Sequence, residues 1–180
     1  QVLGFPSVVA GGIQEVNGRL FPVTLQALEG RVPILIVPPG ETLDAPSAHL
    51  RPDNRRRSAA TALQDWLNVS DPALWGLCTN GQQLRLLRDN PSLTRPAYLE
   101  FDLRQIFDNE DYPTFTMLWL LLHRSRFGRA GAPVTDCALE RWRDAGAKTG
   151  EVALLHLSGN VKEALLALAN GFLAHPDNAE

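Results

Sequence analysis

Lysine is nearly absent from this 180-residue chain, since only Lys148 and Lys162 contribute to its 17 basic residues. Its absence before residue 148 excludes, for that stretch, chemistry that needs a lysine ammonium: a P-loop, a Schiff base, or a nuclease centre built on an acid-x-lysine pair. Arginine supplies most of the positive charge. It is a poor replacement in such sites, because its planar guanidinium stays charged and donates through a fixed fork.

Cysteine and long apolar runs are scarce as well. Cys78 and Cys137 have no metal-ligand spacing and lie in apolar or helical contexts, which predicts two buried free thiols and fits a reducing compartment. The longest apolar run, near 117–122, is too short to cross a bilayer, and the start QVLGFPSVV lacks the features of a secretion signal. We expect a cytoplasmic protein with no membrane partner, and the missing initiator methionine suggests a piece of a longer chain.

Excess positive charge is also lacking. The formal net charge is −3, whereas a domain that grips nucleic acid by bulk electrostatics is usually basic, so any DNA contact is expected to be local. Hydrophobic residues make up 44% of the chain and charged residues 21%, which is ordinary for a globular protein. The length predicts one domain with a short appendage.

Hydrophobic patterning predicts strands first and helices later. After a weakly patterned segment over residues 1–18, strands are expected over 20–28, 32–37, 74–79, 82–87 and 97–101, with a helix over 58–67 between the second and third. Asn80-Gly81 favours a tight hairpin turn. Helices are expected over 103–107, 114–127, 135–145 and 160–172, the second as a buried core helix. The predicted fold is α/β in the α+β sense: a small mixed sheet in residues 1–107 and a helical extension in 108–180.

The middle of the chain resembles a known family. The segments VPILIVPPG, a helix with Gln64, and WGLCTNGQQLRLLRDN follow the order found in the nuclease-like N-terminal domain of bacterial restriction enzymes. The longer run from LQDWLN to FTMLWLLLHRSRF is similar to large bacterial type II restriction-modification proteins that carry an adenine-specific DNA methyltransferase. The resemblance implies a restriction-endonuclease-like core, a role in phage defence, and DNA and other domains of the parent chain as partners. It implies S-adenosylmethionine as the cofactor of a methyltransferase domain outside this chain.

One departure from the family bears on catalysis. Active members end the second strand with an acid-x-lysine pair and carry an acid on the first, and these carboxylates hold Mg²⁺. Here the second strand ends in Val37-Pro38-Pro39, and the first has no acid. We therefore expect a non-catalytic module with no metal or cofactor of its own. Glu41, Asp44 and Gln64 are the catalytic candidates under the alternative of an Mg²⁺-dependent endonuclease with a relocated site.

Arginines in the long polar loop over residues 40–57 are the candidates for DNA contact. Four such contacts with phosphates would give a salt-sensitive affinity. An alternative is a solvated loop ahead of a helix, in which case the chain is a purely structural protein-interaction domain. The candidate DNA-binding residues are Arg51, Arg55, Arg56 and Arg57.

Overall fold

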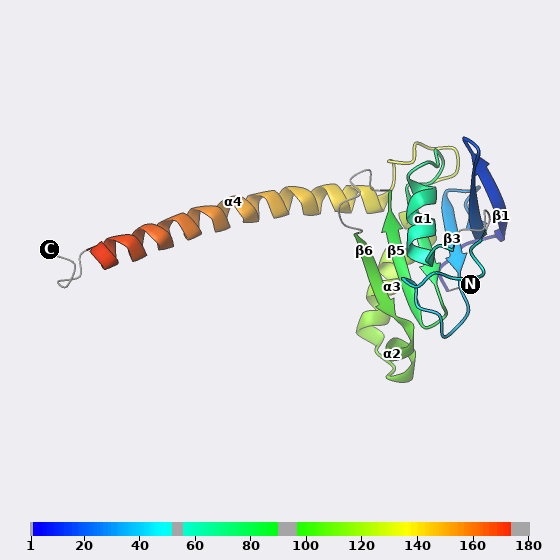
Figure 1. The fold of residues 1–180 in the computed structure, drawn as a ribbon, viewed down its shortest axis with the longest axis horizontal. Helices are drawn as coiled ribbons and strands as arrows, with labels where there is room; N and C mark the ends of the chain where they lie inside the picture. The colour runs from blue at the N-terminus through cyan, green and yellow to red at the C-terminus, as the bar shows by residue number, and fades with distance from the viewer. Residues whose placement is uncertain (1, 52–55, 90–96, 174–180) are drawn as a thin grey trace. The chain divides into compact units, whose positions relative to one another are not determined.

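The computed structural model describes residues 2–51, 56–89 and 97–173 (Figure 1). By internal contacts the chain divides into two units, residues 1–139 and 140–180. The first unit contains the sheet, α2 (Leu103–Asp108) and α3 (Tyr112–Leu122). The sequence analysis placed the residues of α3 in the helical extension, whereas they belong to the unit that holds the sheet. The second unit consists of most of one long helix, α4 (Ala138–Leu173).

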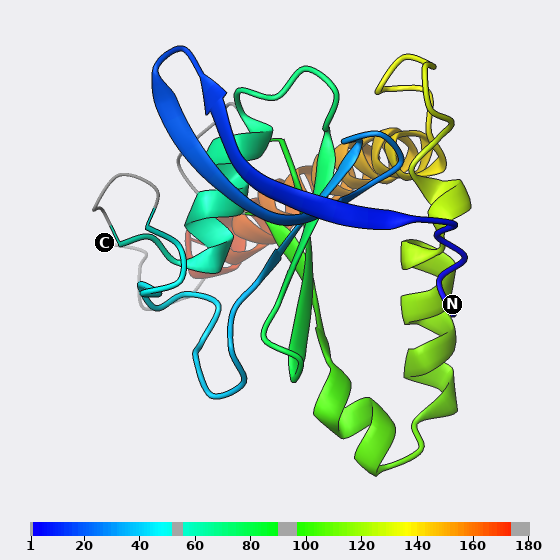
Figure 2. The ribbon, with the colours of Figure 1, turned by 90° about the vertical axis from the view of Figure 1, so that its right-hand side faces the viewer.

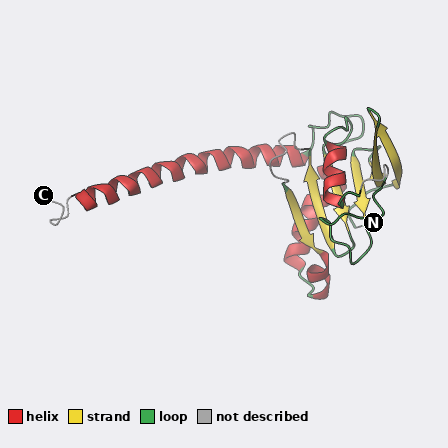
Figure 3. Cartoon of the chain, viewed as in Figure 1, coloured by secondary structure: helices red, strands yellow, loops and turns green. Residues whose placement is uncertain are grey.

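A six-stranded mixed sheet forms the first unit (Figure 3). Its spatial order follows the chain, and every neighbouring pair is antiparallel except β3 and β4, which are parallel. The predicted mixed α+β fold is thereby confirmed. The strands are β1 (Val8–Val16), β2 (Arg19–Ala27), β3 (Val32–Ile36), β4 (Trp75–Thr79), β5 (Gln83–Arg88) and β6 (Tyr98–Asp102).

Helix α1 (Ala59–Leu67) makes the crossover that the parallel pair requires. It begins at Ser58, whose hydroxyl accepts a hydrogen bond of 3.1 Å from the backbone N–H of Thr61. Its apolar residues recur at three- and four-residue spacing, so one face is buried against the sheet. The core on this side contains Leu35, Val37, Leu43, Leu50, Ala59, Leu63, Leu67, Cys78 and Leu87.

Helices α2 and α3 cover the opposite face of the sheet from α1 (Figure 2). Ile106, Leu118 and Leu122 pack there with Leu77, Leu86 and Phe101 of the strands. The prediction of a wholly buried helix over 114–127 was wrong. Helix α3 ends at Leu122, only Leu118 and Leu122 of its side chains are buried, and a short 3-10 helix follows over Arg124–Arg126. When a helix is apolar on all sides, its sequence does not indicate which side packs against the rest of the protein.

Strand β1 occupies the segment whose pattern predicted no element. Asn17 and Gly18 both have positive φ, +52° and +71°, and they form the two-residue turn between Val16 and Arg19. Positive φ at both central positions is the requirement of the tight hairpin turn that Asn-Gly favours. The strand is an edge, and most of its side chains are exposed, so its sequence shows no alternation.

Helix α4 is continuous where the sequence predicted two helices separated by residues 146–159. It runs through Gly146, Gly150 and Gly159, and through Asn160, which had been expected to begin a helix. By length and composition its span Ala138–Phe172 would suffice to cross a membrane, with a mean hydropathy of 1.3 over 18 residues, none of them buried. The cytoplasmic location stays a prediction.

Candidate functional site

The carboxyl ends of β3 and β4 meet at one edge of the sheet because the two strands are parallel. The N–H of Val37 donates to the carbonyl of Thr79 at 3.0 Å, and Pro38 and Pro39 then end the ladder because they have no N–H to donate. The chain turns at once, with Gly40 at a φ of +95° and the N–H of Glu41 donating to Pro38 at 3.2 Å. This edge is where the resemblance puts the acid-x-lysine pair.

Asn80 joins this turn to the β4–β5 hairpin. Its side-chain oxygen accepts from the N–H groups of Gln82 at 3.0 Å and Gln83 at 2.7 Å, and its amide nitrogen donates to the carbonyl of Glu41 at 2.8 Å. The side chain is thus fully engaged, and the residue is only 4% exposed. The predicted tight hairpin is confirmed, but its central residues are Gly81 and Gln82 rather than Asn80 and Gly81, since the N–H of Asn80 donates to the carbonyl of Gln83 at 3.3 Å. Gly81 has a positive φ of +81°.

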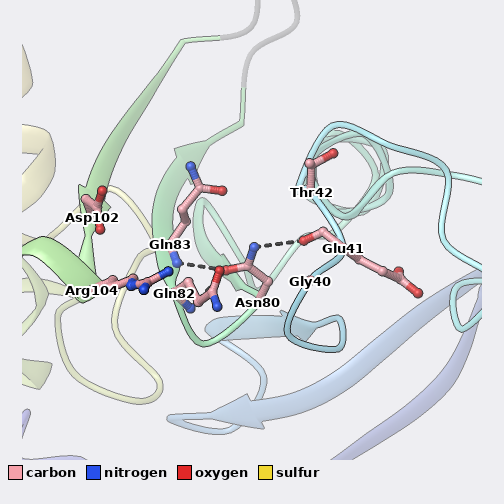
Figure 4. A pocket seen from close by; sticks show the side chains of 8 residues that line it. All are labelled: Gly40, Glu41, Thr42, Asn80, Gln82, Gln83, Asp102 and Arg104. Carbon is pink, nitrogen blue, oxygen red and sulfur yellow. Dashed lines mark hydrogen bonds between the residues drawn. The ribbon is translucent and has the colours of Figure 1, made fainter.

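A polar pocket of about 340 Å³ lies between this turn, the hairpin and the start of α2 (Figure 4). The guanidinium of Arg104 extends from α2 toward Gln82. The lining offers amide and hydroxyl groups, one guanidinium and two carboxylates, which suits hydrogen bonding to a polar ligand. It consists of Gly40, Glu41, Thr42, Asn80, Gln82, Gln83, Asp102 and Arg104.

The two carboxylates of the pocket do not converge. Asp102 caps α2, accepting from the N–H of Gln105 at 2.9 Å. The carboxylate of Glu41 points away from Asp102, with Asn80 and Gln82 between them (Figure 4). One Glu41 oxygen lies 3.8 Å from Nε2 of His49, and no described residue hydrogen-bonds the other, buried oxygen.

Asp44, the second catalytic candidate, is held by Arg85 of β5. The guanidinium of Arg85 donates to both oxygens of Asp44, at 2.6 and 2.7 Å, and also to Glu100 of β6. Its carbon centre lies 4.2 Å from the centre of the Tyr98 ring. The hydrogen bonds from Arg85 lower the pKa of Asp44, and those to Asp44 raise the pKa of Arg85 above its ordinary value. This arrangement pins the loop to the sheet and engages both oxygens of Asp44.

Gln64, the third candidate, lies at the other end of the sheet. Its amide donates to the carbonyl of Arg88 at 3.0 Å and to the side chain of Asn68 at 2.8 Å. Arg88 pairs with Trp75, four residues before Thr79 on β4, which corresponds to about 13 Å along the strand. The structure therefore does not bring Gln64 together with Glu41 or Asp44, and its contacts are those of a residue that fastens α1 to β5.

The loop arginines differ in their surroundings. Arg51 and Arg56 are exposed. The side chain of Arg57 is 11% exposed, lies 3.7 Å from Asp65 of α1 and stacks near the Phe21 ring. Arg55 lies outside the described residues. Of the four candidates, Arg51 and Arg56 are thus accessible to a phosphate, whereas Arg57 is engaged within the fold.

The described residues offer neither a cluster of metal ligands nor an exposed thiol. No group of three or more His, Cys, Asp or Glu side chains is close enough to hold a metal ion in that part of the chain. Both cysteines are buried and free, as predicted. Burial raises the pKa of Cys78 to about 12, so its thiol stays protonated at neutral pH.

Fold and site together define an α+β domain with a sequentially ordered mixed sheet and a polar pocket at the carboxyl ends of its parallel strands. The chain matches no protein-family model, no curated protein and no solved structure.

Two site residues escaped sequence reasoning. Arg85 stands between leucines in QLRLLR, a pattern that predicts a strand with Arg85 on a polar, exposed face. In the structure Arg85 is buried and bonds to Asp44, which lies 41 residues earlier in the chain. Asn80 was interpreted as a turn residue, and only the structure reveals its hydrogen bond to Glu41. Neither contact has a local sequence signal.

Proposed function

We propose that residues 2–139 form a nuclease-like module that has lost metal-dependent cleavage and that supports DNA engagement or domain docking within a restriction-modification methylase. The proposal rests on the family resemblance and on one structural observation. Strand β3, helix α1 and strand β4 have the order and the right neighbours for the nuclease-like layout, with β3 and β4 parallel.

The chemistry of β3 supports the loss of cleavage. Side chains alternate between the two faces of a strand, so an acid-x-lysine pair projects from one face. On β3 one face carries Val32, Ile34 and Ile36, and the other carries Pro33 and Leu35. Neither face offers a carboxylate or an ammonium, and β2 carries no acid either. Mg²⁺ would have no ligand where the family holds it.

DNA contact is proposed for the exposed arginines of the 40–57 loop. Arg51 and Arg56 are exposed. Asn80 and Arg85 hold Glu41 and Asp44 at the start of the same loop, which fixes where the loop leaves the sheet. The acidic overall charge makes such contact local and weak at physiological salt.

The double variant Arg51→Ala/Arg56→Ala is expected to weaken DNA binding about equally for all sequences. Each phosphate contact contributes about 0.9 to the slope of log affinity against log salt, so the slope should fall by about 1.8. Fluorescence anisotropy of a labelled duplex, titrated at several salt concentrations, measures this. Arg129→Ala, which removes another exposed arginine, is the matched control. An unchanged slope would instead favour a structural protein-interaction domain.

The alternative of a relocated Mg²⁺ endonuclease has one observation in its favour: Glu41 and Asp102 line the same pocket near the end of β3. Under that alternative, plasmid nicking with Mg²⁺ or Mn²⁺ is robust and is lost in Glu41→Gln or Asp44→Ala. Under the proposed function, the parent chain, Glu41→Gln and Asp44→Ala all leave the plasmid intact.

A further inference from the structure

Helix α4 carries a narrow apolar stripe along its second half. Each side chain of the stripe is 50–72% exposed. Intervals of 3, 4, 4, 3 and 4 residues separate them, and at 100° per residue all six lie within an arc of about 80°. The stripe consists of Leu154, Leu157, Val161, Leu165, Leu168 and Phe172.

The spacing of the stripe is that of a helix–helix seam. Leu154, Leu157 and Val161 recur eleven residues later as Leu165, Leu168 and Phe172. An eleven-residue repeat keeps apolar side chains on one side of a helix over several turns and characterises supercoiled helices. A stripe this narrow matches another helix better than it matches a broad sheet face. Without a neighbour, a long helix gains little stability from its own apolar side chains.

A lipid surface fits the helix less well. Helices that lie on membranes carry a basic polar face. In residues 138–173 each basic side chain is balanced by an acidic one, and Lys162 and Glu163 sit at the middle of the stripe's length. Burying that pair in the centre of a bilayer would be costly.

We propose that the stripe is the self-association surface of this chain, covered by the same stripe of a second copy. A two-fold interface requires a surface complementary to itself. The six positions are nearly symmetric about residue 163, so two copies can align their apolar side chains over the full length of about 27 Å in either relative direction. One border of the stripe carries Ala153, Ala164 and Gly171, which let a second helix approach closely.

The size of the stripe predicts a reversible dimer. Its six apolar side chains per copy are fewer than the roughly 20–30 residues a side of a standard protein interface. Such an interface dissociates on dilution. The expected behaviour is therefore a concentration-dependent dimer, independent of the DNA-contact proposal, because the stripe and the arginine loop share no residue.

Sedimentation equilibrium of the full chain tests the proposal through two neighbouring leucines. Leu165 lies in the stripe, and Leu166, 53% exposed, lies about 100° away from it. The chain should approach twice its mass of 19.8 kDa as concentration rises. Leu165→Glu should raise the dissociation constant of the dimer at least tenfold, and Leu166→Glu should change that constant less than twofold. Circular dichroism shows whether both variants keep the helix under dimeric conditions.

Three results would overturn the proposal. The first is a monomeric mass at all concentrations. The second is a dimer that Leu165→Glu and Leu166→Glu weaken equally, or that neither variant weakens. The third is flotation of the chain with phosphatidylcholine–phosphatidylserine vesicles that Leu165→Glu abolishes and Leu166→Glu does not, which would assign the stripe to lipid.

Discussion

Replacing Arg85 with methionine is expected to lower the free energy of unfolding by about 2–4 kcal/mol. The guanidinium is buried, with 5% of the side chain exposed, and it is the group that neutralises Asp44 and Glu100. Removing it leaves the carboxylates of Asp44 and Glu100 without their shared cation, although the partial exposure of both keeps the cost below that of a fully buried pair. The melting temperature should fall by about 5–10 °C, measured by calorimetry at neutral pH.

Arg104→Met is the matched control for this loss. The Arg104 side chain is 72% exposed and has a single i,i+4 ion pair with Asp108, a pair typically worth at most about 0.5 kcal/mol. The loss of stability in Arg85→Lys should lie between those of Arg85→Met and Arg104→Met, since an ammonium keeps the charge but not the bidentate contact with Asp44. A melting temperature for Arg85→Met within about 1–2 °C of the parent chain, which is the change expected for Arg104→Met, would contradict this account.

Asn80→Asp is expected to destabilise the fold by about 2–3 kcal/mol and to release the turn at the end of β3. An aspartate keeps the two contacts from Gln82 and Gln83 but has no amide to donate to Glu41, so a carboxylate would face a carbonyl oxygen in a nearly buried position. Chemical denaturation measures the loss. Hydrogen exchange at the Glu41 amide measures the release of the turn.

Gln82→Glu separates the effect of charge from that of the lost donor. It introduces a carboxylate into the same hairpin, two residues after Asn80. The Gln82 side chain is exposed, and the substitution keeps the hydrogen bond from the backbone N–H of residue 82 to the Asn80 side chain. Its expected effect is within about 0.5 kcal/mol. Equal destabilisation by the two variants would mean that added negative charge, not the contact with Glu41, explains the result for Asn80.

Much of the sheet could be predicted from the sequence because the patterns that define its strands and turns are local. The run VPILIV is buried and apolar, and Asn80-Gly81 sets the hairpin, so β3, β4 and β5 begin and end within about two residues of expectation. Strand β1 was missed, although Asn17-Gly18 carries the same turn signal as Asn80-Gly81. Its exposed, glycine-containing sequence has no alternation, and only pairing with β2 makes it a strand.

The helical half was less predictable because helix ends and burial depend on neighbours. Glycines at 146, 150 and 159 lower helix propensity, which suggested a break, but α4 continues through all three. In the candidate site, Glu41 and Asp44 were chosen because they closely follow β3 along the chain, and Gln64 was chosen from the family resemblance. Their actual partners, Arg85, His49 and Arg88, come from elements whose placement only tertiary packing determines.

The central claim is that the module engages DNA without cleaving it. The most direct test incubates the full chain with supercoiled plasmid and Mg²⁺ or Mn²⁺, then runs each sample on a gel before and after protease digestion. The account predicts retarded plasmid before digestion, with retardation lost as salt is raised, and unchanged supercoiled plasmid after it. Nicked or linear plasmid that depends on the metal and on Glu41 or Asp44 would contradict the account.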